Sequence, residues 1–289
     1  MNNMANILSR VTVETDTGNI IADGHIFEDC MRKTKGELAQ WLYCVLHTGN
    51  INSISADTFN KASDITEYIR ETVSDPKVLV PITAQNKVTD GIIDYLGVRV
   101  RYDEEDAKRG TVSLSCHRPC LTPGFYMFVN TEAGHGNEVI RHYIAARDYK
   151  YAVNCWSTAI EKLLADDVKF SAKVLSNTSN YPRNDAVVFY CSAENAEKVR
   201  GVLADTVKNM QEDDPMEGSP FCSKVVNNLS CAEQPVKGKA AVQSFGEHRC
   251  NCIADAIQDC FTTGLPFEML LANRLKQYSI DKDDLSKNL

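Results

Sequence analysis

The order of elements in the second half of the chain constrains its fold more than any other feature. Val139–Ala145 alternates as a strand does, and Ala152–Ala165 repeats apolar residues at helical spacing. Strands are predicted next at Val168–Leu175 and Asp185–Cys191, followed by a helix at Ala193–Met210. This β-α-β-β-α order predicts an α+β fold in which a mixed or antiparallel sheet has helices packed on it.

The first third of the chain predicts a helical segment that precedes this sheet. His25–Leu46 carries apolar residues on one helical face, and a second helix is predicted near Ala56–Thr72, before Pro76. We therefore expect residues 1–75 to be a helical N-terminal segment and residues 76–289 to be an α+β domain. Further short strands are predicted at residues 77–80, 97–102, 111–115 and 125–130.

The C-terminal part predicts two helices and a loose end. Residues 250–277 have helical periodicity on both sides of a break at Gly264-Leu265-Pro266. The last dozen residues have no such pattern, and we expect them to be loosely held.

Composition excludes several classes of protein and partner. The chain of 289 residues has a formal charge of −8, so we expect no general nucleic-acid binding, and it has no apolar run long enough to span a membrane. Eleven cysteines and an N-terminus without a signal-peptide core favour a cytoplasmic protein with reduced thiols. Neither Cys116/Cys120 nor Cys250/Cys252 has zinc-site spacing, and no common nucleotide-binding or hydrolase motif is present, so no metal or cofactor is expected.

Polar residues on the predicted sheet form a first candidate site. Arg141 and Tyr143 are two apart in one strand and share a face, which Lys173 and Tyr190 would join if the strands are neighbours. A lysine ammonium, a tyrosine hydroxyl and an arginine guanidinium on one face could together bind a phosphate or a carboxylate group. The alternative is a solvated polar face, with Lys173 simply exposed.

A loop and a helix start supply the remaining candidates. The loop before the strand at residue 185 brings together Tyr181, Arg183 and Asp185. Ser244-Phe-Gly-Glu247 fits a capping box, so His248 and Arg249 lie in the first turns of a helix, where free N–H groups attract anions. An ordinary capped helix is the alternative. Lys224, Lys237 and Lys239 are further cations, and His117, Arg118 and His135 are weaker candidates.

Three motifs resemble the HopA-type effector domain family. They are the Arg-x-Tyr strand with KVL and Tyr-Pro-Arg-x-Asp-Ala between Glu138 and Tyr190, the segment PFCSKVV around Lys224, and SFGEHRC from Ser244 to Cys250. PFCSKVV has one residue more than the family's Pro-Phe-Thr-Lys segment, so the match of Lys224 is less secure than the others.

The resemblance implies one of two functions. One branch of that family is associated with peptide maturation, where a lyase eliminates phosphate from phosphoserine or phosphothreonine after a kinase has acted; the other comprises type III effectors secreted into a host cell. For a lyase we expect Lys173 or Lys224 as base and His248 as general acid. Arg141, Arg183 and Arg249 would bind phosphate, and Tyr143, Tyr181 and Asp185 would position the substrate. The alternative is an effector or phosphopeptide-binding module without catalysis.

Overall fold

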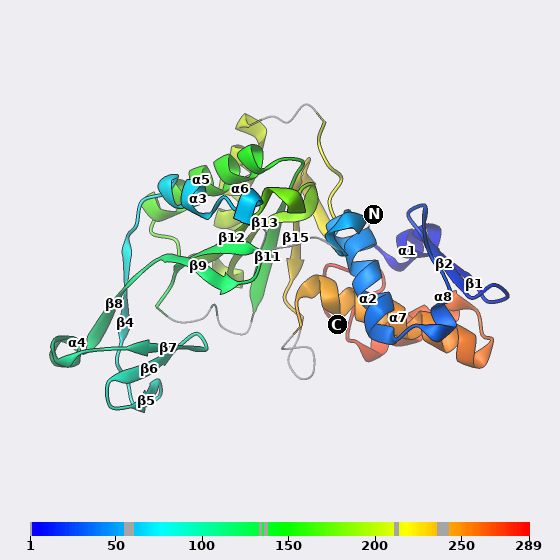
Figure 1. Ribbon diagram of the computed structural model, residues 1–289, viewed down its shortest axis with the longest axis horizontal. Helices are drawn as coiled ribbons and strands as arrows, with labels where there is room; N and C mark the ends of the chain where they lie inside the picture. Colours follow the sequence, from blue (N-terminus) through cyan, green and yellow to red (C-terminus); the bar gives the residue numbers. More distant parts are fainter. Residues whose placement is uncertain (1, 55–60, 133–134, 136–137, 211–213, 236–242) are drawn as a thin grey trace.

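A seven-stranded antiparallel sheet forms the centre of the molecule (Figure 1). The computed structural model describes residues 2–54, 61–132, 135, 138–210, 214–235 and 243–289. Within them the strand order is β14-β15-β11-β13-β12-β10-β9, and every neighbouring pair is antiparallel. The predicted α+β class is therefore confirmed. The strands are β9 (His117–Thr122), β10 (Phe125–Asn130), β11 (Val139–Ala146), β12 (Phe170–Leu175), β13 (Arg183–Ser192), β14 (Ser223–Val226) and β15 (Leu229–Glu233).

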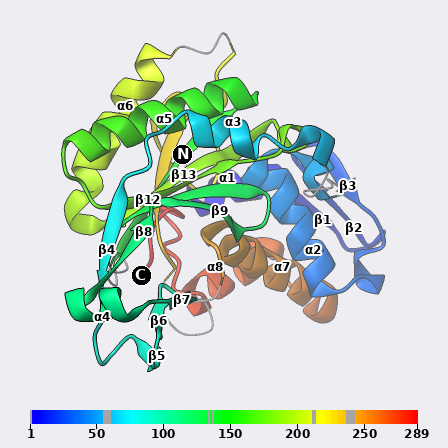
Figure 2. The same ribbon diagram turned by 60° about the vertical axis from the view of Figure 1, so that its left-hand side comes forward.

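Two amphipathic helices cover one face of this sheet. They are α5 (Tyr149–Ala165) and α6 (Ala196–Asn209), and the short helix α3 (Thr66–Glu71) lies beside them (Figure 2). Asp148 caps α5 by accepting hydrogen bonds from the N–H groups of Lys150 and Tyr151. The apolar side of α5 is fully buried, with Trp156 edge-on to two aromatic residues of β10. This side of the sheet holds the larger share of the hydrophobic core.

The other face of the sheet packs against segments from both ends of the chain. The helix α2 (Lys35–Leu42), the π-helical turn η2 (Tyr43–Thr48) and the helix α7 (Phe245–Thr263) form a second core with Tyr143 and Val188 of the sheet. The helices α1 (Met4–Arg10) and α8 (Phe267–Gln277) lie on the outer side of this layer (Figures 1 and 2). The second core therefore joins residues that are more than 200 positions apart in the sequence.

The N-terminal segment differs from the helical prediction. It contains a three-stranded antiparallel sheet of β1 (Val11–Glu14), β2 (Asn19–Ala22) and β3 (His25–Phe27). Asp29 adopts a left-handed conformation, and the helix α2 begins after Thr34, which forms a capping box with Glu37. The helix expected from His25 therefore starts ten residues later. The second predicted helix corresponds to α3, but its residues 55–60 lie outside the described part of the chain.

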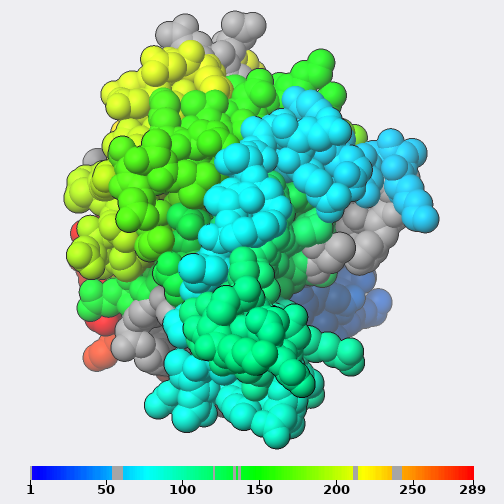
Figure 3. Space-filling model, turned by 90° about the vertical axis from the view of Figure 1, so that its left-hand side faces the viewer, coloured from blue at the N-terminus to red at the C-terminus, as the bar shows by residue number. Residues whose placement is uncertain are grey.

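A small arm projects from the sheet at its lower left in Figure 1 and toward the viewer at the bottom of Figure 3. The pair β4 (Lys77–Pro81) and β8 (Thr111–Ser115) leads to a three-stranded sheet at its tip. That sheet and the helix beside it consist of β5 (Lys87–Thr89), β6 (Ile92–Tyr95), β7 (Val98–Arg101) and α4 (Glu104–Arg109). The arm buries few large side chains compared with the body of the molecule.

The C-terminal end is held firmly, contrary to the expectation of a loose tail. The two predicted helices are present as α7 and α8, and Gly264 closes α7 in a left-handed conformation. After α8 the chain folds back over the molecule, where Leu285 and Ser286 are buried. The N–H of Leu285 donates to the carbonyl of Asn2, and the N–H of Met4 donates to the carbonyl of Lys282. This segment is therefore held by backbone hydrogen bonds, and such pairing does not produce a periodic pattern in the sequence.

Candidate functional site

The register of the sheet places the predicted polar residues on one face. Arg141 pairs with Tyr190 of the neighbouring strand, and Tyr143 and Lys173 both pair with Val188, from opposite sides. Residues that pair directly across strands point to the same face, so Arg141, Tyr143, Lys173 and Tyr190 share the face that packs against α2 and α7. Val188, which is small, lies between Tyr143 and Lys173.

A shift of register turns two more polar residues toward this face. Ile144 pairs with Val187, whereas Ala146 pairs with Arg183, so β13 advances four residues while β11 advances two. Ala186 and Val187 both lie in the core under α5 and α6, so the usual alternation is interrupted there. The side chains of Arg183 and Asp185 consequently lie on the same side as Val188, where they contact Tyr43.

Arg183 and Asp185 form a buried ion pair with two contacts. Nε and Nη2 of Arg183 donate to the two carboxylate oxygens of Asp185 at 2.7 and 2.8 Å. Burial alone would raise the pKa of Asp185, but the Arg183 guanidinium outweighs it and holds the pKa well below its ordinary value. The hydroxyl of Tyr43 donates to the same carboxylate at 3.3 Å. Asp185 therefore positions Arg183 and Tyr43 and remains ionised.

Lys173 lies beside this pair. Its Nζ is 3.8 Å from the centre of the Phe125 ring, and the guanidinium carbon of Arg183 is 5.6 Å from the same point. Within the described residues, no hydrogen bond or ion pair holds the Lys173 ammonium group. The amine is therefore a positive charge without a carboxylate of its own.

His47 lies at the centre of the group, although the sequence analysis did not identify it. It belongs to the π-helical turn η2, a kind of distortion that is frequent at functional sites, and is 2% exposed. Its Nδ1 is 3.1 Å from Oγ of Ser219, and its Nε2 is 4.0 Å from a carboxylate oxygen of Asp185. Burial lowers the pKa of His47 to about 4; Asp185 opposes this shift, and the three cations Arg183, Arg141 and Lys173 add to it. The imidazole is therefore neutral at pH 7.

Gly246 explains part of the SFGEHRC motif. A Cβ atom at this position would lie 2.3 Å from Cδ2 of His47, so only glycine allows α7 to approach the imidazole this closely. The ring of Phe245 also packs against His47 and Tyr143. The motif thus contributes to the site through its glycine and phenylalanine. In the sequence, a glycine in the first turn of a capped helix is the one feature that indicates that another part of the chain lies close to Gly246.

Arg141 and Tyr143 form the other end of the group. Nε of Arg141 donates to the side-chain oxygen of Gln234 at 2.5 Å, and its guanidinium lies 5.1 Å from the centre of the Tyr190 ring. Arg141 forms no ion pair with a carboxylate in the described residues. The hydroxyl of Tyr143 is buried close to Arg141, and among the described residues no group forms a well-aligned hydrogen bond with it. Burial raises the pKa of Tyr143, so the hydroxyl keeps its proton as a donor.

His248 and Arg249 lie away from this group, on other sides of α7. Nη1 of Arg249 donates to Nδ1 of His248 at 2.7 Å, and the imidazole packs against the ring of Tyr278. Burial and Arg249 lower the pKa of His248 to about 4. Among the described residues, no contact joins His248 to Lys173 or Arg183. A buried neutral imidazole in this position does not favour the expected role of general acid.

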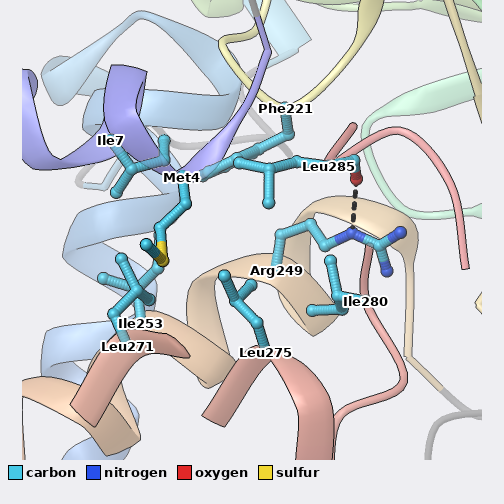
Figure 4. Close-up of a pocket in the computed structure, with 9 residues that line it drawn as sticks. All are labelled: Met4, Ile7, Phe221, Arg249, Ile253, Leu271, Leu275, Ile280 and Leu285. Carbon is cyan, nitrogen blue, oxygen red and sulfur yellow. Dashed lines mark hydrogen bonds between the residues drawn. The ribbon is translucent and has the colours of Figure 1, made fainter. Parts of the chain in front are cut away.

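Arg249 points into the C-terminal layer. Figure 4 shows its guanidinium beyond an apolar lining that includes Met4 and Leu275, donating from Nε to the carbonyl of Leu285 at 2.9 Å. Burial lowers the pKa of Arg249 to about 10. All of its nitrogen atoms are engaged by protein groups. The expected role of Arg249 in binding phosphate therefore has no support in its contacts.

Two other predicted residues also lie elsewhere. Lys224 is on the edge strand β14, with its side chain 46% exposed and its Nζ 3.6 Å from a carboxylate oxygen of Glu217. The strand register puts Lys224 on the same sheet face as Lys173, but four strand spacings separate the two residues, about 19 Å in all. Tyr181 packs on the α5 side of the sheet, where its hydroxyl donates to the carbonyl of Leu175.

Of the remaining candidate residues, some lie near this group and others lie away from it. Nε2 of His135 lies 2.9 Å from Oγ of Ser171, which pairs with Tyr190 and so lies at the margin of the site. His117 instead contacts the hydroxyl of Tyr126, and Arg118 donates to the backbone carbonyls of Ser115 and His117. Lys237 and Lys239 lie outside the described residues, as does the side chain of Cys120.

The central group is best suited to an anion. We call Arg141, Lys173 and Arg183, with the hydroxyl of Tyr143, the cationic cluster; its three positive charges face the single negative charge of Asp185. Through the described part of the chain, no three His, Cys, Asp or Glu side chains are arranged to hold a metal ion. No helix in that part is both long and apolar enough to cross a membrane.

Comparisons with known proteins identify the family. Residues 116–286 match the model of the HopA1 effector protein family. The structure of the effector protein from Pseudomonas syringae pv. syringae strain 61 is similar, with 18% identity, a TM-score of 0.52, and coverage of 90% of this chain and 91% of that one. For the effector from Pseudomonas syringae pv. tomato strain DC3000 the values are 15%, 0.43, 82% and 94%. Comparison with curated proteins finds no match.

The match to the family model agrees with the resemblance that the sequence motifs indicate. It covers more than half of the chain and includes all three motifs, and the first similar structure shares the fold. The predicted resemblance is therefore confirmed, and the chain belongs to the HopA1 effector protein family.

Proposed function

We propose that this effector-family protein acts by binding a phosphorylated serine or threonine of a peptide or protein at the cationic cluster. The observation that supports this most is that Arg141 and Lys173, on one sheet face, have no carboxylate partner among the described residues. Buried or half-buried cations are ordinarily paired, so an unpaired set favours an anionic ligand. Effector-family membership favours delivery into a host cell over the cytoplasmic location expected from composition.

A phosphate group matches the donors that this cluster offers. It carries about −1.5 to −2 charges near pH 7 and has three acceptor oxygens. Within the described residues, Gln234 engages only Nε of Arg141 and leaves its two Nη atoms without a hydrogen bond, and Arg183 uses Nε and Nη2 but not Nη1. Lys173 and the hydroxyl of Tyr143 supply further donors from either side of Val188. Asp185, already neutralised by Arg183, adds little repulsion.

The second candidate is elimination of that phosphate, which the unpaired amine of Lys173 favours. In this reaction Lys173 acts as the neutral amine: it takes the Cα proton and becomes an ammonium, the C–H electrons form the Cα=Cβ bond, and the Cβ–O bond breaks to release phosphate. Arg141 and Arg183 stabilise the charge that develops on the leaving oxygen, and Tyr143 donates a hydrogen bond to it. The product is a dehydroamino acid. A kinase reaction must supply the substrate, and no cofactor takes part.

One set of experiments tests both candidates. Binding of a phosphothreonine peptide and of the same peptide without phosphate is measured by calorimetry, and the phosphopeptide is analysed by mass spectrometry after incubation. Binding predicts at least a tenfold preference for the phosphopeptide, from charge-assisted hydrogen bonds. Elimination predicts a loss of about 98 Da, the mass of phosphoric acid, whereas hydrolysis predicts a loss of about 80 Da.

Lys173→Met and Lys224→Met form a matched pair of variants. Methionine keeps the unbranched stem of Lys173 over Phe125 but removes its charge, so binding and any elimination should be strongly reduced. Lys224→Met removes the same charge at an exposed edge and should leave both unchanged. Equal affinity for the two peptides would refute the binding proposal. If the phosphopeptide binds tightly but stays intact, the protein is a binding module and the lyase proposal is excluded.

A further inference from the structure

We propose that the C-terminal residues 285–288 form a latch that positions Arg141 for its ligand, and that Arg249 holds this latch closed. The identity of the ligand rests on the function proposed above, but the positioning itself is a property of the contacts described below. Arg249 and Asn288 are then positioning residues, which act on the site through Gln234 rather than by touching the ligand. The latch gives the arginine of the SFGEHRC motif a role, since its guanidinium binds residues 285–288 and not the cationic cluster.

The first step of the latch is Arg249. Its Nε donates to the carbonyl of Leu285 at 2.9 Å, and its Nη2 donates to the carbonyl of Lys287 at 3.0 Å and to Oδ1 of Asn288 at 3.3 Å. The side chain is 2% exposed, with its guanidinium 4.5 Å from the centre of the Phe245 ring. Three contacts from a buried, charged group fix the latch much more firmly than a surface contact would.

The second step is Asn288. Its backbone N–H donates to a carboxylate oxygen of Glu233 at 2.9 Å, and its Nδ2 donates to the carbonyl of Gln234 at 2.8 Å. The N–H of Glu233 donates in turn to the carbonyl of Ser286. The latch therefore lies along the end of β15 and holds the residue that follows this strand.

The third step is Gln234. Its N–H donates to the carbonyl of Val139, and its side-chain oxygen accepts the Nε hydrogen bond of Arg141 at 2.5 Å. This bond, with the ring of Tyr190 on one side, fixes the plane of the Arg141 guanidinium and leaves its two Nη atoms for a ligand. Two parallel donors bind a phosphate well only when their plane is set in advance. Displacing the latch should therefore weaken binding of the ligand, because Arg141 would no longer be held in position.

Asn288→Ala tests the latch, because it removes the contact with Gln234 and leaves the apolar core intact. Asn273→Ala, at an exposed position of α8, is the matched control. We expect Asn288→Ala to weaken binding of the phosphothreonine peptide about tenfold, and to have almost no effect when Arg141 is already alanine. Equal weakening in both backgrounds would mean that the tail acts only on general stability, and would overturn the proposal, as would no weakening at all.

A second measurement does not depend on the ligand. The Nε–H group of Arg141 gives a nitrogen-15 NMR signal that Arg141→Lys removes, and its hydrogen bond should make it exchange slowly with water. Asn288→Ala should accelerate that exchange, and Asn273→Ala should not. If the phosphopeptide does not bind the unmodified protein, the proposed function fails, and this signal alone decides on the latch. An unchanged Nε–H exchange rate in Asn288→Ala refutes the latch even if the peptide binds.

Discussion

Replacing Gly246 with alanine tests the close approach of α7 to His47, on which the centre of the site depends. The added Cβ would lie 2.3, 2.5 and 2.7 Å from three atoms of the imidazole. Carbon atoms in favourable contact are about 3.5–4.0 Å apart, so one partner must move by more than 1 Å. His47 cannot turn aside easily, because Tyr43, Tyr143, Phe221 and Phe245 surround its ring.

The size of the effect follows from two opposing contributions. Inserting a methyl group into a packed interior typically costs about 1–3 kcal/mol. Alanine is favoured over glycine in a helix by up to about 1 kcal/mol, and less at this position because it lies in the first turn. We therefore expect Gly246→Ala to lower the free energy of unfolding by about 1–2 kcal/mol. For a chain of this length each kcal/mol corresponds to a fall of about 2–4 °C in Tm.

Chemical denaturation with two further variants checks the cause. Gly201 lies inside α6 and a Cβ there would meet no atom within 4 Å, so Gly201→Ala should raise the free energy of unfolding by about 0.4–1 kcal/mol. In a His47→Ala background the obstacle is gone, and Gly246→Ala should lose its penalty. If Gly246→Ala is as stabilising as Gly201→Ala, or if its penalty persists without His47, the proposed contact is wrong.

Three further predictions concern charge. Asp185→Asn leaves Arg183 buried without its partner, and urea denaturation should show a loss of about 3–5 kcal/mol. Because burial lowers the pKa of folded His47 from 6.5 to about 4, the unfolded chain binds its proton first; the free energy of unfolding should fall as the pH drops from 6.5 to 4, and His47→Gln should make that fall shallower. Lys224→Ala removes only an exposed pair with Glu217 and should change stability by less than about 0.5 kcal/mol in thermal melts.

Much of the sheet could be predicted because its signals are local. Residues 111–115 and 125–130 have the expected bounds, and α5, α7 and α8 follow from apolar periodicity and caps. The shared face of Arg141 and Tyr143 also follows from alternation alone. The sequence leaves open whether Lys173 joins that face, and the structure settles it by placing β13 between β11 and β12.

The rest of the site depends on contacts between residues far apart in the chain, which no local sequence pattern indicates. The register shift at Ala186 turns Asp185 toward the site against simple alternation, and His47 enters from a turn about 140 residues earlier. His248 and Arg249 were expected at an anion site because a helix N-terminus attracts anions in general. Arg249 instead binds the C-terminal tail, and His248 packs against Arg249 and Tyr278. The pairing of this tail with Glu233 could not be seen in its sequence.

The second hydrophobic core imposes an order on biosynthesis. Residues 7–46 meet most of their partners in this core only when the chain has been extended through α7 and α8, and Asn2 must then meet Asp284, 282 positions away. The central sheet can assemble earlier from strands that are close in sequence. A nascent chain at that stage could already pair the strands that carry Lys173, Arg141 and Arg183. Residues 285–288, which hold Arg141 through Gln234, and Tyr43 and His47 come into place only when the two ends of the polypeptide close together.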